Sequence, residues 1–143
     1  MSKSIFDAYA TDAVAEMAGV EITADLFPDA VFTVARAGGA NEVYAKEGEK
    51  KFRPHRKAIQ NGKLDNDLAT KLAMELFVDT QLKGWKGVQH RNKETKQIED
   101  LPFTRENAIL VFTQLPELHI ELQQKAQRMQ TFQREVEEDD AKN

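Results

Sequence analysis

Three histidines have the most potential for metal binding or proton transfer: His55, His90 and His119. They lie far apart in the sequence, and none belongs to the short ligand spacings that zinc sites use. The run Asp65 to Asp67 is similar to the start of an EF-hand loop. Positions 6 and 12 of that loop would be Thr70 and Leu76, where calcium loops need Gly and Glu. The sequence therefore predicts no metal and no cofactor.

Nucleophiles and paired carboxylates with a catalytic setting are also scarce. The chain has no cysteine, which excludes disulfides and thiolate chemistry, and its only serines are Ser2 and Ser4. Adjacent carboxylates occur in Glu135 to Asp140, where solvent would leave nothing to make one an acid and its neighbour a base. Gly84 to Gly87 lacks the spacing of a phosphate-binding loop. We therefore expect a protein without catalysis.

One segment concentrates positive charge: Lys46, Lys50, Lys51, Arg53, Arg56 and Lys57. Such a stretch could meet phosphates or an acidic partner. Glu47 and Glu49 dilute it, and a solvated helix face is the favoured interpretation. The formal net charge of −4 argues against a general nucleic-acid binder. Nucleic acid is therefore not an expected partner, and a small nucleic-acid-binding regulator stays open as an alternative.

Apolar residues at helical spacing mark the C-terminal part of the chain: Leu118, Leu122, Ala126, Met129, Phe132 and Val136. The stripe is typical of core packing, and the alternative is a surface that receives a partner helix. Trp85 lies between two glycines, where it would anchor the end of a helix or contact a partner. We predict that a partner surface includes these residues: Trp85, Leu118, Leu122, Met129 and Phe132.

The elements that must position these residues begin with a helix and a hairpin. Apolar spacing predicts a short, loose helix within residues 1–19. Alternation at Val20 to Ile22 and the run Val31 to Ala35 predict two strands, with Phe27-Pro28-Asp29 as the turn. A lone hairpin is marginal in water, so we expect it to lie against helices.

Helices are predicted for most of the remaining chain. Asn41 would begin one that runs toward Phe52, and Pro54 interrupts it. Asp65 would begin the clearest helix, with Lys83 in its last turn and Gly84 after its end.

A loop or weak hairpin is expected from His90 to Asp100. Thr104 would begin the next helix, and Pro116 suits the first position of the last one. The predicted fold class is α+β, a mainly helical single domain with a small N-terminal β-hairpin.

Length and composition agree with one domain. At 143 residues the chain fits a single core, expected over 1–134, followed by an acidic segment at 135–143 that we expect to be disordered. No apolar run approaches the roughly 18 residues needed to span a membrane, and the N-terminus has no signal-peptide pattern. A cytoplasmic location without membrane contact is expected.

The order of four motifs resembles the tail assembly chaperones of phages and prophages with long, non-contractile tails, the family with a frameshifted longer form. The stretches are Phe6 to Asp12 with Gly19 to Ile22; Phe32 to Gly39 with Asn41, Tyr44 and Arg53 to Arg56; Gly84 to Val88; and Leu101 to Ala108 with Leu115 to Leu118, Phe132 and the acidic end. Together these stretches span nearly the whole chain.

The resemblance implies a non-catalytic role in the host cytoplasm. Such chaperones hold the helix-rich tape measure protein, recruit subunits of the major tail tube protein, and are absent from the mature virion. A longer frameshifted form and self-association are open alternatives. The rival interpretation is a structural virion component, such as a tail-terminator or head–tail connector protein, which would stay in the particle.

Overall fold

Two short helices precede the sheet. The computed structural model describes residues 3–133. Its first helix, α1 (Ile5–Ala8), begins with a reciprocal capping box between Ser4 and Asp7. The Asp12 side chain caps α2 (Ala13–Ala18) by accepting hydrogen bonds from the N–H groups of Val14 and Ala15. The expected single helix is therefore two helices, because Asp12 starts a second one.

A three-stranded antiparallel sheet follows, in the order β1-β2-β3. Ile22 pairs with Phe32 across β1 and β2, and Phe32 pairs with Trp85 across β2 and β3. The predicted N-terminal hairpin is confirmed. The strands are β1 (Val20–Ala24), β2 (Phe27–Val34) and β3 (Leu82–Lys86).

The turn of this hairpin lies at residues 25–26, so its prediction at Phe27-Pro28-Asp29 is wrong. Ala24 pairs with Phe27, and the register then shifts so that Thr23 pairs with Val31. Residues 28–30 thus form a bulge, and pairing of β2 with β3 begins only at Val31. Pro28 is tolerated because its missing N–H falls in this unpaired stretch.

The long helix α5 (Asn66–Thr80) begins as predicted, since Asp65 accepts a hydrogen bond from the N–H of Leu68. Its predicted end at Lys83 and Gly84 is wrong, because both residues lie in β3. The strand state is selected by pairing with β2, where Val34 faces Leu82. A nonlocal ladder therefore overrides the local helical signal.

The other predicted helix starts are confirmed. Thr104 caps its helix, and Pro116 occupies the first turn of the next. Asn41 precedes its helix, but its side chain donates to the carbonyls of Arg36 and Thr80 instead of capping. The bounds are α3 (Glu42–Phe52), η1 (Arg53–His55), α4 (Arg56–Gln60), α6 (Arg105–Gln114), α7 (Pro116–Gln127) and η2 (Met129–Phe132).

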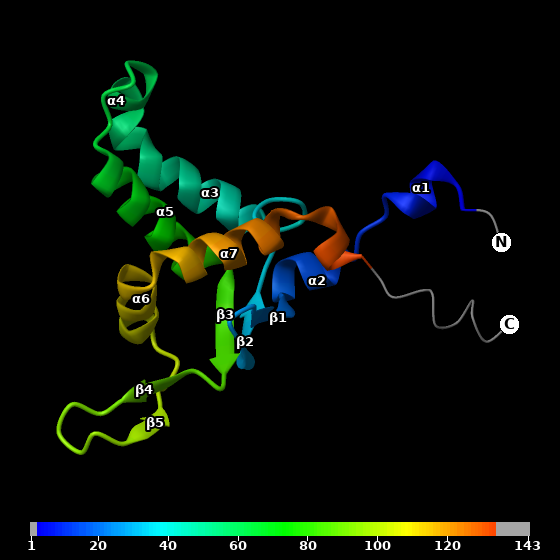
Figure 1. The fold of residues 1–143 in the computed structure, drawn as a ribbon. Coiled ribbons are helices and arrows are strands. Elements are labelled where there is room, and N and C mark those ends of the chain that lie inside the picture. Colours follow the sequence, from blue (N-terminus) through cyan, green and yellow to red (C-terminus); the bar gives the residue numbers. More distant parts are fainter. Residues whose placement is uncertain (1–2, 134–143) are drawn as a thin grey trace, which may run out of the picture.

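A second hairpin extends away from the body of the fold (Figure 1). It consists of β4 (Gln89–Arg91) and β5 (Ile98–Asp100), which pair antiparallel. Its turn is ordered by Asn92, whose side-chain oxygen accepts hydrogen bonds from the N–H groups of Glu94 and Thr95. The stretch expected to be a loop or weak hairpin is therefore a hairpin.

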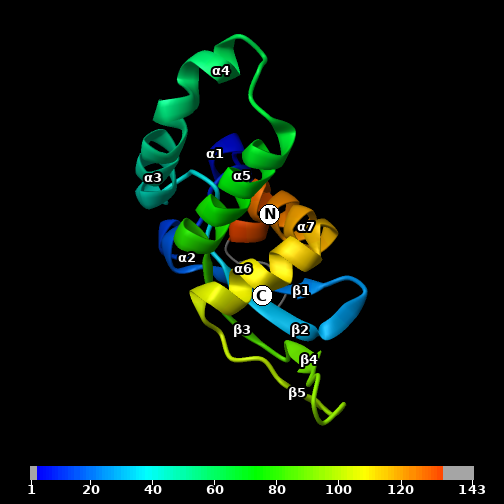
Figure 2. The same ribbon diagram turned by 90° about the vertical axis from the view of Figure 1, so that its left-hand side faces the viewer.

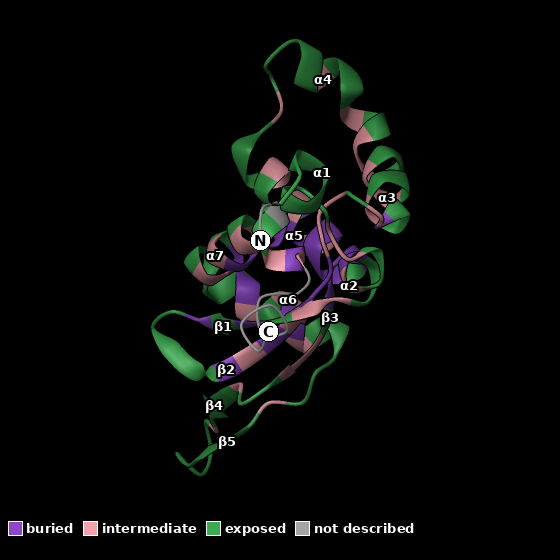
Figure 3. Cartoon of the chain, turned by 90° about the vertical axis from the view of Figure 1, so that its right-hand side faces the viewer, coloured by how far each residue is buried: buried purple, intermediate pink, exposed green. Residues whose placement is uncertain are grey.

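The core lies where α5, α6 and α7 cover one face of the three-stranded sheet (Figure 2). Its centre is aromatic: the rings of Phe77 and Phe112 meet edge to face at 5.5 Å, and Phe112 reaches Phe32 at 6.3 Å. Buried residues concentrate there, whereas α3, α4 and the β4–β5 hairpin are mostly exposed (Figure 3). Among residues 3–133, no helix is long and apolar enough to cross a membrane.

Candidate partner-binding groove

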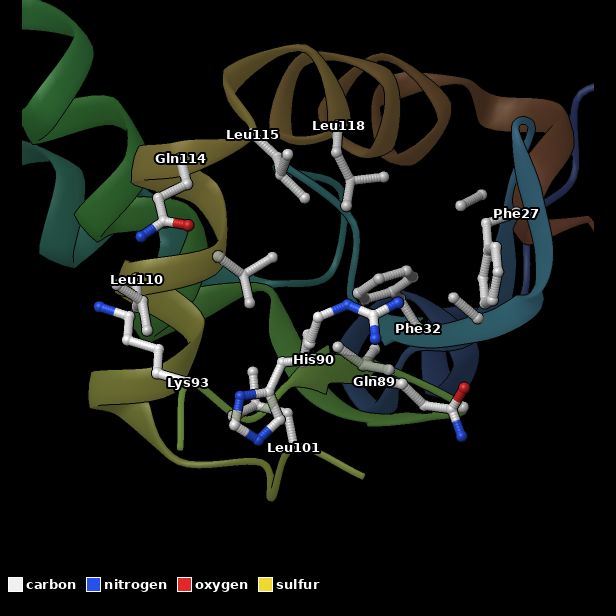
Figure 4. Close-up of a pocket in the computed structure, with 16 residues that line it drawn as sticks. Phe27, Phe32, Gln89, His90, Lys93, Leu101, Leu110, Gln114, Leu115 and Leu118 are labelled. Carbon is white, nitrogen blue, oxygen red and sulfur yellow. The ribbon is translucent and has the colours of Figure 1, made fainter. Parts of the chain in front are cut away.

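An apolar groove with a volume of about 490 Å³ opens beside the sheet (Figure 4). It is surrounded by four segments: the bulged start of β2, the residues at β4, the second half of α6 and the beginning of α7. Phe32 and Ala30 of β2 contribute buried side chains, and Leu118 of α7 is half-buried. Phe27, Leu110 and Leu115 stay largely exposed at its edges. The volume is in the range of ligand-binding pockets, about 300–1,000 Å³.

The bend between α6 and α7 forms one side of this groove. Leu115 ends α6 and precedes α7 with a non-helical backbone (φ −123°, ψ 68°), and Pro116 starts the new helix. The change of direction brings Leu110 of α6 and Leu118 of α7 to the same hollow. Leu115 and Leu118 point from this bend toward the sheet (Figure 4).

The connection from β3 to β4 forms the opposite side and is held tightly against β2. Gly87 has a left-handed backbone (φ +71°), and a Cβ atom there would lie 2.1 Å from the carbonyl oxygen of Asp29. The N–H of Leu101 donates to the carbonyl of Val88 at 2.9 Å. These contacts fix Val88 and Leu101 in the lining of the groove.

Positive charge lines the β4 side of the groove. Arg91 and Lys93 line it together with His90, and no aspartate or glutamate of residues 3–133 is among the lining residues. His90 Nε2 lies 3.3 Å from Glu99, and the Arg91 guanidinium donates to the carbonyl of Lys96 at 2.6 Å. Lys93 is exposed and forms no ion pair within residues 3–133. The groove is thus cationic at one edge, although the whole chain carries a net charge of −4.

The predicted partner residues occupy different environments. Leu118 lines the groove, whereas Leu122 and Phe132 are 0% and 1% exposed in the core. Met129 lies in η2. Half-buried Trp85 lies on β3, where its ring meets Phe32 and Phe103 edge to face. Of the four residues whose side chains the structure describes, it brings only Leu118 to the groove, and partner contact by any of the five stays a prediction.

Sequence reasoning missed most of the groove: Phe27, Leu110, Leu115, Arg91 and Lys93. The sequence did hold a signal for this site, because Leu110 and Leu115 are large apolar residues just before the helix break at Pro116. They lie outside the predicted apolar stripe, which begins at Leu118. Val136 and the acidic segment at 135–143 lie outside the described residues.

Carboxylates pair with part of the basic segment from Lys46 to Lys57. Lys51 pairs with Glu75 of α5 at 3.1 Å. Arg53 and Arg56 share Glu49, at 3.4 and 3.2 Å. None of these cations lines the groove. The segment is a charged helix surface in which Glu47, Glu49 and Glu75 pair with four of the six cations.

The histidines do not form a metal centre. Among residues 3–133, no group of three or more histidine, aspartate or glutamate side chains is placed to hold an ion. His119 is buried against the rings of Phe77 and Phe112, at centroid distances of 5.0 and 5.9 Å. Burial lowers the pKa of His119 below its ordinary value, because the charged imidazolium loses its hydration there.

Comparison with known proteins identifies the family. No curated protein and no solved structure matches the chain. A family model described as "YdaY prophage protein" matches residues 39–143, which include every element from α3 onward. Because this match covers well over half of the sequence, the chain belongs to the YdaY prophage protein family.

Proposed function

We propose that this prophage protein is a tail assembly chaperone that holds the tape measure protein and recruits tail tube subunits, without catalysis. The observation that carries the proposal is the open apolar groove, whose edges are Phe27, Leu110 and Leu115. Large exposed apolar side chains around a hollow are typical of protein-binding sites. The order of motifs that resembles tail assembly chaperones supports the same role.

A holding chaperone needs an apolar surface that its client can enter and leave, together with enough charge to stay dispersed. The groove supplies the first, and the charged residues of α3 and α4 supply the second. The tape measure protein of such phages is long and helix-rich, so before assembly it exposes apolar helix faces. Binding these faces in the host cytoplasm would prevent their aggregation.

Co-expression with the tape measure protein of the same prophage, followed by affinity purification, tests this role. We expect the tape measure protein to stay soluble and to co-purify. The double variant Leu110→Ser, Leu115→Ser should lose this capture. Ile120→Ser is the matched control, since Ile120 is 50% exposed on α7 outside the groove, against 53% for Leu115.

Composition of purified particles separates the proposal from its rival. A chaperone is absent from finished tails, whereas a tail-terminator or connector protein stays in them. Detection of this chain in particles at a fixed copy number, together with an insoluble tape measure protein, would replace the chaperone role with a structural one.

A further inference from the structure

We infer that the groove binds an amphipathic helix that carries carboxylates along one flank. Its apolar face would fill the hollow, and its acidic flank would lie against Arg91 and Lys93. This inference rests on the proposed function, in which the helix is a segment of the tape measure protein. It adds the chemistry by which the site would choose among apolar helices.

The apolar part of the recognition comes from two opposed walls. Phe32 provides one wall from the sheet side, and Leu115 and Leu118 provide the other from the helical side (Figure 4). Val88 also lines the groove. Side chains spaced three and four residues apart on a helix form a single ridge, which suits a hollow between two walls. Burial of this ridge supplies the main driving force.

A helix fits this site better than an extended strand does. Peptides that bind as strands need the free backbone edge of a sheet. Here β2 is the central strand, paired on both sides, and it presents side chains to the groove. Of the strands that line the groove, β4 has an unpaired edge, but it spans only Gln89 to Arg91 and would leave most backbone groups of an extended peptide unpaired.

The electrostatic part of the recognition comes from the uneven distribution of charge around the rim, that is, the opening of the groove. Arg91 and Lys93 stand on the β4 side, and the described part of the chain adds no acidic residue to the lining. Lys93 lines the groove from the turn after β4 (Figure 4), and it has no carboxylate partner within the described chain. A helix with glutamate or aspartate on that flank would supply this partner, and a lysine-flanked helix would meet repulsion.

The test uses two labelled helical peptides of equal length with leucines at positions i, i+3, i+4 and i+7. One carries glutamates along one flank of the leucine ridge, and the other carries lysines there. Fluorescence anisotropy with the full chain measures both affinities at low and high salt. We expect the glutamate peptide to bind roughly tenfold more tightly at low salt, with the difference shrinking as salt screens the rim.

Charge reversal supplies the decisive comparison. Arg91→Glu, Lys93→Glu should invert the preference, so that the lysine peptide binds more tightly. Lys93→Glu alone should reduce the preference. This single variant keeps the hydrogen bond from Arg91 to the carbonyl of Lys96, so it provides a second test if the double variant folds poorly. The matched control is Lys50→Glu, Lys57→Glu, which makes the same change of net charge on α3 and α4, and it should keep the original preference.

Each result has one meaning. Equal binding of both peptides, or a preference that charge reversal does not move, overturns the inference. If the glutamate peptide binds only after Glu135, Glu137, Glu138, Asp139 and Asp140 are neutralised, the groove belongs to the chain's own acidic end, which also overturns it. Peptide selectivity without capture of the tape measure protein supports the groove chemistry and rejects the proposed function. Capture of the tape measure protein without peptide selectivity supports the proposed function and rejects the groove chemistry.

Discussion

The indole N–H of Trp85 donates a hydrogen bond to the carbonyl oxygen of Leu101 at 2.8 Å. This bond joins β3 to the segment that follows β5, so it closes the base of the second hairpin. Leu101 lines the groove and Trp85 does not. Trp85 therefore supports the groove wall from behind, and its ring contacts with Phe32 and Phe103 connect that wall to the core.

Replacing Trp85 with Phe tests this support. The variant keeps an aromatic ring but leaves the Leu101 carbonyl without its donor, which should lower the free energy of unfolding by about 1 kcal/mol. Urea unfolding followed by far-UV circular dichroism measures the loss. We also expect weaker capture of the tape measure protein, because the wall loses an anchor. An unchanged unfolding free energy would show that the bond adds no support.

Replacing Gly87 with Ala should destabilise the protein through two effects. The left-handed backbone disfavours any Cβ, and the added atom would collide with the carbonyl oxygen of Asp29. Together these should cost about 3 kcal/mol. Gly62→Ala is the control, since Gly62 has φ +65° but no atom lies within 4 Å of the place its new methyl group would take, and it should cost only about 1 kcal/mol. Similar losses in the two variants would remove the collision from the explanation.

Breaking the ion pair between Arg36 and Glu16 should destabilise the fold strongly. Glu16 is buried, and besides Arg36 it accepts a hydrogen bond from the Thr11 hydroxyl at 3.0 Å. Arg36→Met would leave a buried carboxylate without its cation, at a cost of about 3 kcal/mol. Thermal and urea unfolding measure this loss.

The matched control is Arg105→Met. Arg105 forms a two-bond contact with Asp79, at 2.7 and 3.1 Å, but on the exposed surface. Removal of an exposed ion pair should cost no more than about 1 kcal/mol. Equal losses for the two variants would contradict a special role for burial at Glu16.

His119 should make stability depend on pH. Burial lowers its folded-state pKa below the ordinary value of 6.5, so the unfolded chain takes up the proton more readily. The contribution of His119 to the free energy of unfolding is therefore fully present above pH 6.5. It is lost as pH falls from there toward the folded-state pKa. His119→Phe should flatten the pH profile of unfolding free energy in that window.

The control for this experiment is His90→Gln, because His90 is exposed. Carboxylates also make the unfolding free energy depend on pH, and they do so equally in the parent chain and in both variants. Subtracting the parent profile from each variant profile therefore removes the carboxylate contribution. If His119→Phe and the parent chain show the same slope below pH 6.5, His119 is not the group that titrates.

The sequence by itself determined the features that depend on neighbours along the chain. Asp65 and Thr104 begin helices because each side chain reaches the N–H group three residues later. Pro116 starts a helix for an equally local reason, its fixed φ and missing donor. The β1–β2 hairpin follows from alternation and a short connection.

Only the tertiary structure decided the third strand and the groove. Residues 82–86 carry the local signal of a helix end at Lys83 and Gly84, and pairing with β2 makes them a strand instead. Leu122 and Leu118 belong to one apolar stripe, yet the first is in the core and the second in the groove. The groove gathers side chains from β2, β4, α6 and α7. Its shape depends on how these elements pack, and spacing along the chain carries no information about contacts between residues that are distant in sequence.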